Sequence, residues 1–134
     1  MPAGYSGTPL ARKLGFTDDL PVWAPGLPGS VRAEIETTAH PCFLARPAKG
    51  LAAAHVFHTS AAGLEADLMR LRPIIAPDGR VWVSWPKKAA KVATDITEDT
   101  VRQLALPMGF VDVKVCAVDA VWSGLKLVIR KELR

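Results

Sequence analysis

Two continuous apolar segments most restrict the folds open to this chain: Leu51 to His58 (LAAAHVFH) and Arg80 to Trp85 (RVWVSW). Unbroken apolar runs of this length are typical of strands buried on both faces of a parallel sheet. Between them, Ser60 precedes AAGLEADLMRLR, in which leucines recur at helical spacing, and Pro73 should shorten or kink this helix. A strand, a helix and a second strand in this order predict a right-handed parallel crossover.

The rest of the chain continues this alternation. Thr8-Pro9 and Thr97 are typical helix starts, and Gly15 and Gly109 are typical helix ends. We expect helices over about 9–14, 30–37, 61–72 and 98–108, and strands over about 20–24, 42–45, 51–58, 80–85, 111–118 and 121–130. The sequence therefore predicts one α/β domain over residues 1–134. We expect a Rossmann-like mixed sheet of about six strands, mostly parallel, with helices on both faces and an antiparallel C-terminal hairpin whose last strand forms the edge.

Length and charge narrow the class of protein. The chain has 134 residues, 49% of them hydrophobic, which suits one core, and its formal charge of +4 is modest for a dedicated nucleic-acid binder. No apolar run approaches the ~20 residues of a membrane span, and the first residues lack a signal-peptide core, so we expect a cytoplasmic protein without a membrane partner. Cys42 and Cys116 have no CxxC spacing, and we expect free, buried thiols.

The carboxyl-terminal half carries a family resemblance. A helix, the segment LRPIIAPDGRVWVSW, a capped helix ending in LPMGFVDVKV and a final hairpin resemble the class I methyltransferases, which have a Rossmann-like fold. More closely, GYSGTPLARKLG, WVSWPKK and ATDITEDTVRQLALPMGFVDVKVCAVDAVWSGLKLV resemble an uncharacterised family of short bacterial proteins that look like trimmed methyltransferase folds. The resemblance implies the methyltransferase strand order 2-1-4-5-7-6, with the third strand absent, and it supplies no established function.

Two departures from that pattern concern the cofactor. A class I methyltransferase holds S-adenosylmethionine with a glycine-rich loop after its first strand and an acidic residue after its second. Here the first loop is APGLPG (residues 24–29), in which two prolines remove amide donors, and ARP (residues 45–47) follows the second strand without a nearby Asp or Glu. We therefore expect no cofactor and a non-catalytic binding or scaffold protein. A divergent S-adenosylmethionine-dependent methyltransferase stays open as an alternative.

Isolated catalytic and metal motifs are better explained by structural roles. The segment Ser84 to Lys87 matches S-x-x-K, but its serine ends a strand and neither S-D-N nor K-T-G follows. His55 and His58 are three residues apart in a strand, which sends them to opposite faces, and only His40 and Cys42 are close in sequence as further ligands. We expect structural histidines at strand ends, no metal site and no catalytic residue.

Acidic and aromatic side chains also have structural explanations. Asp95, Glu98 and Asp99 surround Thr97, where carboxylates favour a helix N-terminus without any catalytic role. Tryptophans among apolar neighbours in strands belong to a core more often than to a base-stacking platform. We apply this interpretation to all four tryptophans, Trp23, Trp82, Trp85 and Trp122.

The best candidate site is the loop that follows the strand ending at Trp85. Ligands of open α/β sheets bind beyond the carboxyl ends of the strands, where this loop places several lysines and hydroxyl groups. We expect them to bind a phosphate or carboxylate by charge rather than to catalyse a reaction. The candidate residues are Ser84, Lys87, Lys88, Lys91 and Thr94. A weak anion, nucleotide or nucleic-acid binder is thus a further alternative, aided by a basic face of the final hairpin that could equally protect an edge strand (Lys114, Lys126 and Arg130).

Overall fold

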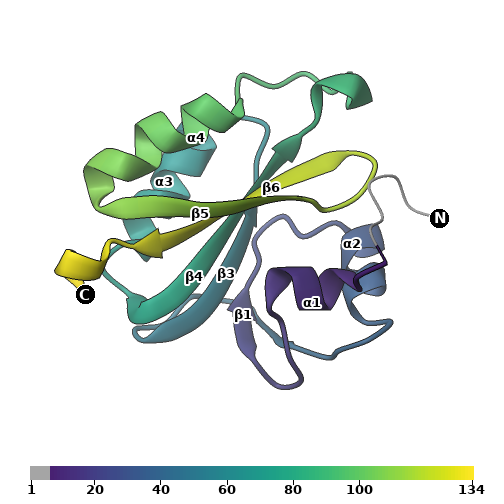
Figure 1. Ribbon diagram of the computed structural model, residues 1–134, viewed down its shortest axis with the longest axis horizontal. Helices are drawn as coiled ribbons and strands as arrows, with labels where there is room; N and C mark the ends of the chain where they lie inside the picture. Colours follow the sequence, from purple (N-terminus) through teal and green to yellow (C-terminus); the bar gives the residue numbers. More distant parts are fainter. Residues whose placement is uncertain (1–6) are drawn as a thin grey trace.

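Six strands form one sheet with helices on both faces (Figure 1). The computed structural model describes residues 7–134, so the first residues of the GYSGTPLARKLG motif lie outside the described part. The strands are β1 (Pro21–Trp23), β2 (Cys42–Leu44), β3 (Leu51–Phe57), β4 (Ile75–Pro86), β5 (Phe110–Ala117) and β6 (Trp122–Ile129). The helices are α1 (Leu10–Leu14), α2 (Gly29–Ile35), α3 (Ala61–Leu71) and α4 (Glu98–Ala105), with 3₁₀ turns η1 (Lys88–Ala90), η2 (Leu106–Met108) and η3 (Lys131–Leu133).

The strand order is β2-β1-β3-β4-β6-β5. The first four strands are mutually parallel, and β6 runs antiparallel to both β4 and β5. This order confirms the one implied by the methyltransferase resemblance. The expectation that the last strand forms the edge is wrong, because β6 pairs on both sides and leaves β5 at the edge. Alternate residues of β6 point to the same face of the sheet and are buried there, which is expected of a strand with a neighbour on each side. These residues are Leu125, Leu127 and Ile129.

Local capping signals place the helices where the sequence predicts them. The Ser60 hydroxyl accepts a hydrogen bond from the Gly63 amide at 3.4 Å, and Thr97 forms a capping box with Thr100 at the start of α4. Helix α3 ends at Leu71, before Pro73, since proline cannot continue an α-helix. Gly109 has φ +99° and stops the turn that follows α4.

The sheet separates two apolar layers. Helices α3 and α4 cover one face, and α1 and α2 cover the other, toward the β1 end of the sheet (Figure 1). Trp82 of β4 lies under α1, and its indole Nε1–H donates to the Leu14 carbonyl at 2.9 Å. Trp23, Trp82 and Trp85 are buried and Trp122 is half-buried, which confirms a core role for the tryptophans.

The two cysteines differ in exposure. Both are free thiols, as expected, but only Cys116 is partly buried. Cys42 is exposed because it opens β2, which is the other edge strand and has a neighbour on one side only. Over residues 7–134, no helix is long and apolar enough to cross a bilayer.

Candidate functional site

The four parallel strands end at one edge of the sheet. Their last residues are Trp23, Leu44, Phe57 and Pro86, and the segment 87–97 follows β4 there. We call this segment the lysine loop. Its backbone is tied to its surroundings at both ends: the Lys87 amide donates to the Val121 carbonyl at 2.6 Å, and the Thr94 hydroxyl donates to the Thr59 carbonyl at 2.7 Å. The loop is therefore held over the sheet edge at which open α/β sheets bind ligands.

A pocket of about 530 Å³ lies between the lysine loop, the end of β4 and the start of α4. This size falls in the range of small-molecule sites. The lining combines apolar side chains with an ammonium, two hydroxyls and a carboxylate. The lining residues are Trp85, Pro86, Lys88, Val92, Thr94, Ile96, Thr97 and Glu98.

The structure brings together only part of the predicted residue set. Lys88 and Thr94 line the pocket, whereas Lys87 and Lys91 are not among its lining residues. Lys91 adopts a left-handed conformation with φ +56° and ends the η1 turn. Ser84 lies inside the sheet, fully buried, so its hydroxyl does not reach the loop.

Of the two charged residues that line the pocket, Glu98 has an ion-pair partner and Lys88 has none among the described residues. Arg102 forms ion pairs with Glu98, Asp99 and Asp112, and its hydrogen bonds to Asp112 and Glu98 raise the pKa of the guanidinium. Glu98 is thus already neutralised from the side of α4. Within residues 7–134 no carboxylate pairs with Lys88, so this exposed ammonium is the cation that a ligand would meet.

The sequence interpretation missed a buried polar pair in the sheet. The His55 Nε2 lies 2.7 Å from the Ser84 hydroxyl, and both residues are fully buried. Burial lowers the pKa of His55 to about 3. The ring stacks on Phe57 at a centroid distance of 4.1 Å. His55 therefore lies well inside β3 rather than at a strand end, and the parallel pairing of β3 with β4 was the signal that could have joined it to Ser84.

His58 has a different environment, on the other side of the sheet. Its Nε2 lies 2.6 Å from the Asp67 carboxylate of α3, and both side chains are one-fifth exposed. His55 instead faces Phe16 and Phe57 in the layer beneath α1 and α2. The expectation of opposite faces is confirmed. In the described range no three His, Cys, Asp or Glu side chains are grouped to hold a metal ion.

The acidic residues near Thr97 serve two helices. Glu98 and Asp99 lie in the first turn of α4, as expected. Asp95 instead accepts a hydrogen bond from the Ala61 amide at 2.7 Å, which caps α3, a helix 34 residues earlier in the chain. Its position two residues before Thr97 suggested α4 instead. The lysine loop passes over the start of α3, and this brings Asp95 to that helix.

The first loop, residues 24–29, folds down onto the end of β3. The Pro25 carbonyl accepts a hydrogen bond from the Phe57 amide at 3.3 Å. Gly26 has φ +77°, and a Cβ at this position would lie 3.1 Å from the Phe57 carbonyl oxygen. The backbone of the loop is thus in close contact with the strand end beneath it.

The connection from β2 to β3 is unusually direct. Two parallel strands of one sheet are normally joined through a crossover of a dozen or more residues, usually a helix. Here only residues 45–50 join β2 to β3, and they contain no helix. This segment reads ARPAKG and holds no carboxylate.

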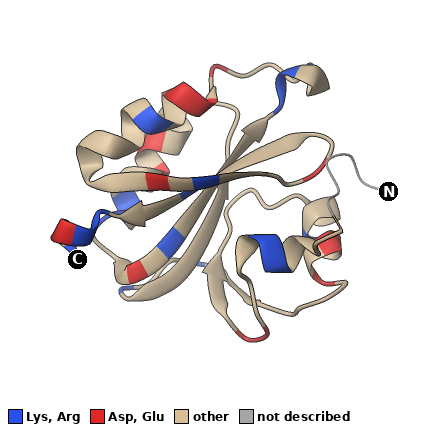
Figure 2. Ribbon diagram, viewed as in Figure 1, with Lys and Arg blue, Asp and Glu red and all other residues tan. Residues whose placement is uncertain are grey.

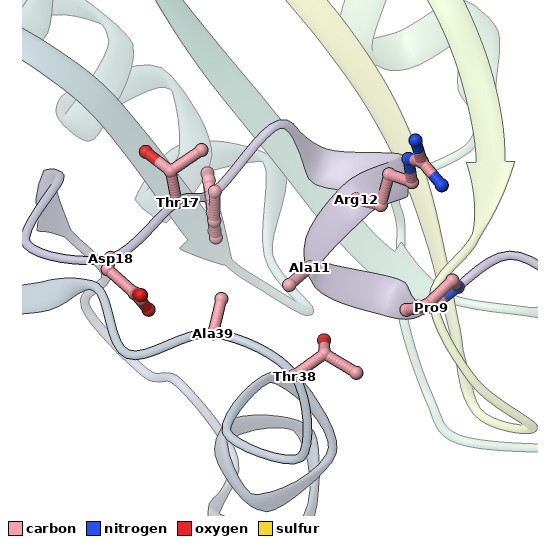
Figure 3. Close-up of a pocket in the computed structure, with 8 residues that line it drawn as sticks. Pro9, Ala11, Arg12, Thr17, Asp18, Thr38 and Ala39 are labelled. Carbon is pink, nitrogen blue, oxygen red and sulfur yellow. The ribbon is translucent and has the colours of Figure 1, made fainter.

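A second pocket, of about 380 Å³, lies near the opposite end of the strands, between α1 and the segments that precede β1 and β2. Asp18 on its rim accepts a hydrogen bond from the His40 amide at 2.8 Å. Ala11, Thr38 and Ala39 surround the space, while the Arg12 guanidinium points away from them (Figure 3). This pocket offers little chemistry beyond a small apolar hollow.

Comparisons with known proteins concern the fold. No protein-family model and no curated protein matches the sequence. A protein of Sulfolobus solfataricus assigned to the type 11 methyltransferases superposes with a TM-score of 0.62 at 13% identity, over 91% of this chain and 90% of that one. A Burkholderia thailandensis 1,6-didemethyltoxoflavin-N1-methyltransferase with S-adenosylhomocysteine bound gives 0.60 at 15% identity, over 90% and 74%. A TehB-like S-adenosylmethionine-dependent methyltransferase of Corynebacterium glutamicum gives 0.54 at 9% identity, over 96% and 91%.

These likenesses establish a Rossmann-like methyltransferase fold. The mixed sheet of six strands, its antiparallel last two strands and the helices on both faces are therefore as the sequence predicted. Membership of the uncharacterised bacterial family stays a prediction, because no family model matches. At these identities the activity of the neighbours does not carry over with the fold.

Proposed function

We propose that this protein is a non-catalytic binding protein built on the methyltransferase fold. We further propose that its ligand lies in the pocket beside Lys88 and not in the usual cofactor position. The observation that carries the proposal is the conformation of the first loop, whose Gly26 backbone packs against the Phe57 carbonyl. In a methyltransferase the corresponding loop offers its amides to S-adenosylmethionine.

The short connection between β2 and β3 supports the same proposal. An acidic residue after the second strand normally holds the ribose hydroxyls of the cofactor. In this chain residues 45–50 run directly into β3 and supply Arg46 and Lys49 instead of a carboxylate. The cofactor would lose one partner at each of the two segments that grip it.

The pocket beside Lys88 suits a small molecule with an anionic group and an apolar part. Lys88 supplies a charge, and Trp85 and Ile96 supply apolar lining. The hydroxyls of Thr94 and Thr97 are already bonded to the Thr59 carbonyl and to Thr100. One charge within a largely apolar lining can fix the orientation of such a ligand. No group in the pocket is activated as a nucleophile or base by the contacts described.

Calorimetric titration with S-adenosylmethionine and S-adenosylhomocysteine tests the cofactor part of the proposal. No heat of binding is expected up to millimolar ligand. Micromolar affinity for either compound would refute it.

The ligand pocket is tested with anilinonaphthalene sulfonate, an apolar anion whose fluorescence rises on binding. Replacing Lys88 by Gln should weaken binding at least about tenfold, since a hydrogen bond to a charged group contributes about 1.5–3 kcal/mol. Lys91→Gln, in the same loop but outside the pocket lining, is the matched control and should change the affinity less than about twofold. Equal losses of affinity in the two variants would refute the proposal that the ligand lies in this pocket.

A divergent S-adenosylmethionine-dependent methyltransferase is the second candidate, and the structural neighbours favour it. The Burkholderia enzyme contains S-adenosylhomocysteine, and other neighbours are described with bound S-adenosylmethionine. The overall likeness thus points to the cofactor, whereas the first loop and the β2 to β3 connection point away from it. The calorimetric titration separates the two candidates directly.

A further inference from the structure

A basic groove separate from the lysine loop lies between α1 and the edge strand β5. It has a volume of about 630 Å³ and is lined by Thr8, Arg12, Lys13, Lys114, Val115, Cys116 and Ala117. Three of these seven side chains are cationic, and none is a carboxylate. We call this hollow the α1–β5 groove.

Further cations lie on the sheet beside the groove. Lys114 of β5 pairs directly with Lys126 of β6 in the antiparallel register. Side chains directly opposite each other on neighbouring strands have Cβ atoms about 4.5–5.5 Å apart, and like charges there are destabilising. Burial, Arg80 and Lys114 together lower the pKa of Lys126. The fold thus places several positive charges close together, although they repel one another.

The nearby carboxylates are engaged elsewhere. Asp112, on the same strand as Lys114, accepts a hydrogen bond from the Arg102 Nε at 3.0 Å. Asp119, in the turn after β5, accepts from the Val121 and Trp122 amides. Neither carboxylate forms an ion pair with Lys114 in the described part of the chain. Figure 2 shows basic segments in α1, β4 and β5, with acidic segments further along β4 and β5.

The direction of Arg12 supports a binding role. Its guanidinium points away from the alanine-lined hollow of Figure 3, and Arg12 lines the α1–β5 groove together with Lys114. Arg12 and Lys114 are both exposed, so their charges face solvent. A guanidinium presents two parallel donors that match a phosphate, and lysines add point charges around it.

We propose that the α1–β5 groove binds a small ligand through two or more linked phosphate groups. The cations come from two elements on opposite sides of the groove, so one ligand group can meet Arg12 while the next meets Lys114. The described lining contains no aromatic ring on which a base could stack, so the phosphates rather than a nucleobase are recognised. This site is independent of the function proposed for the pocket beside Lys88.

The test is calorimetric titration of the whole protein with inorganic pyrophosphate at low salt. The double variant Arg12→Gln, Lys114→Gln should lose at least about tenfold in affinity, because each charge-assisted hydrogen bond contributes a factor of this order. The matched control is Arg46→Gln, Lys131→Gln, which removes the same charge from exposed positions outside the groove and should lose less than about threefold. Lys114→Gln alone, at an exposed strand position, repeats the test if the double variant is unstable.

Two comparisons complete the test. Adenosine diphosphate should bind within about threefold of pyrophosphate if the phosphates carry recognition, and inorganic phosphate about tenfold more weakly. The proposal is overturned if pyrophosphate does not bind at millimolar concentration. It is overturned equally if the two double variants lose affinity to the same extent, because binding then follows net charge and not the groove.

Discussion

The two ends of the sheet are built differently. At one end, β4, β6 and β5 have twelve, eight and eight residues and pair along most of their length. At the other end, β1 and β2 have three residues each. The long strands are covered by α3 and α4 in one extensive apolar layer, whereas the short ones are linked by loops rich in proline.

Proline explains much of this difference. A proline cannot donate to a sheet ladder, so within sheets it lies at the first residue of a strand, in edge strands or at bulges. The one interior case in the long strands, Pro77 of β4, lies where the register with β3 shifts. Pro21 is the first residue of β1, and Pro25 and Pro28 follow within the next loop. Pro41 and Pro47 bracket β2 in the same way. The ladder cannot lengthen in this half of the molecule.

Stability and ligand chemistry can therefore reside in different parts of the sheet. The long strands hold the core, so substitutions there act on folding. The short strands end in the two segments that would carry a cofactor in a methyltransferase, so departures there act on binding.

The largest expected effect is acid sensitivity of the junction between β3 and β4. Folded protein keeps His55 neutral down to about pH 3, whereas the unfolded chain takes up this proton near pH 6.5. The unfolded state therefore binds more protons in this interval, and the free energy of unfolding falls as the pH drops from 6.5 to 3. The loss from this group is on the order of 4 kcal/mol, since each pKa unit corresponds to 1.36 kcal/mol.

Urea denaturation at several pH values measures this dependence. His55→Leu together with Ser84→Ala removes both members of the buried pair and should flatten the dependence by up to one proton. An unchanged slope would place the acid sensitivity outside the buried pair.

A matched pair of leucine substitutions should separate the two ends of the sheet. Leu127 in β6 is fully buried, and Leu44 in β2 is half-buried at the edge. Leu127→Ala should lower the free energy of unfolding by about 3 kcal/mol, because it leaves a cavity in the core, and Leu44→Ala by only about 1 kcal/mol. Denaturant midpoints measure both. Similar losses in the two variants would mean that the short strands contribute as much as the long ones.

A smaller effect is expected in the first loop. Gly26→Ala places a side chain at φ +77° and a Cβ 3.1 Å from the Phe57 carbonyl oxygen, which should cost about 1–2 kcal/mol. Gly29→Ala is the control, because this helical glycine has no heavy atom within 4 Å of the added Cβ. Its stability should be unchanged or higher by less than about 1 kcal/mol. If both variants are equally stable, the first loop is not held against β3.

Local signals in the sequence account for most of the fold. Ser60, Thr97 and Gly109 mark helix boundaries through contacts within a few residues, and the apolar runs mark β3 and β4. These features depend on near neighbours in the chain, so they could be predicted. The resemblance implied the central position of β6, whereas the expectation that the last strand of the closing hairpin forms the edge was wrong.

The candidate site was less predictable because its contacts are distant in sequence. Ser84 was expected at the loop, but the pairing of β3 with β4 places it against His55, 29 residues away. Asp95 caps a helix that begins at Ala61. Lys88 and Thr94 were found because a loop after a parallel strand lies at a known edge of the sheet. The α1–β5 groove brings together residues from opposite ends of the chain, and no pattern in the sequence joins them.

The insertion of β6 between β4 and β5 sets the order in which the sheet can be assembled. During synthesis β5 emerges before β6, yet the ladder that attaches β5 to the sheet is made with β6. Strands β1 to β4 can pair as soon as they are available, while β5 must wait for its later partner. We therefore expect the β5–β6 hairpin to dock onto β4 as one unit, so that β6 fills the middle of the sheet and buries Leu125 and Leu127.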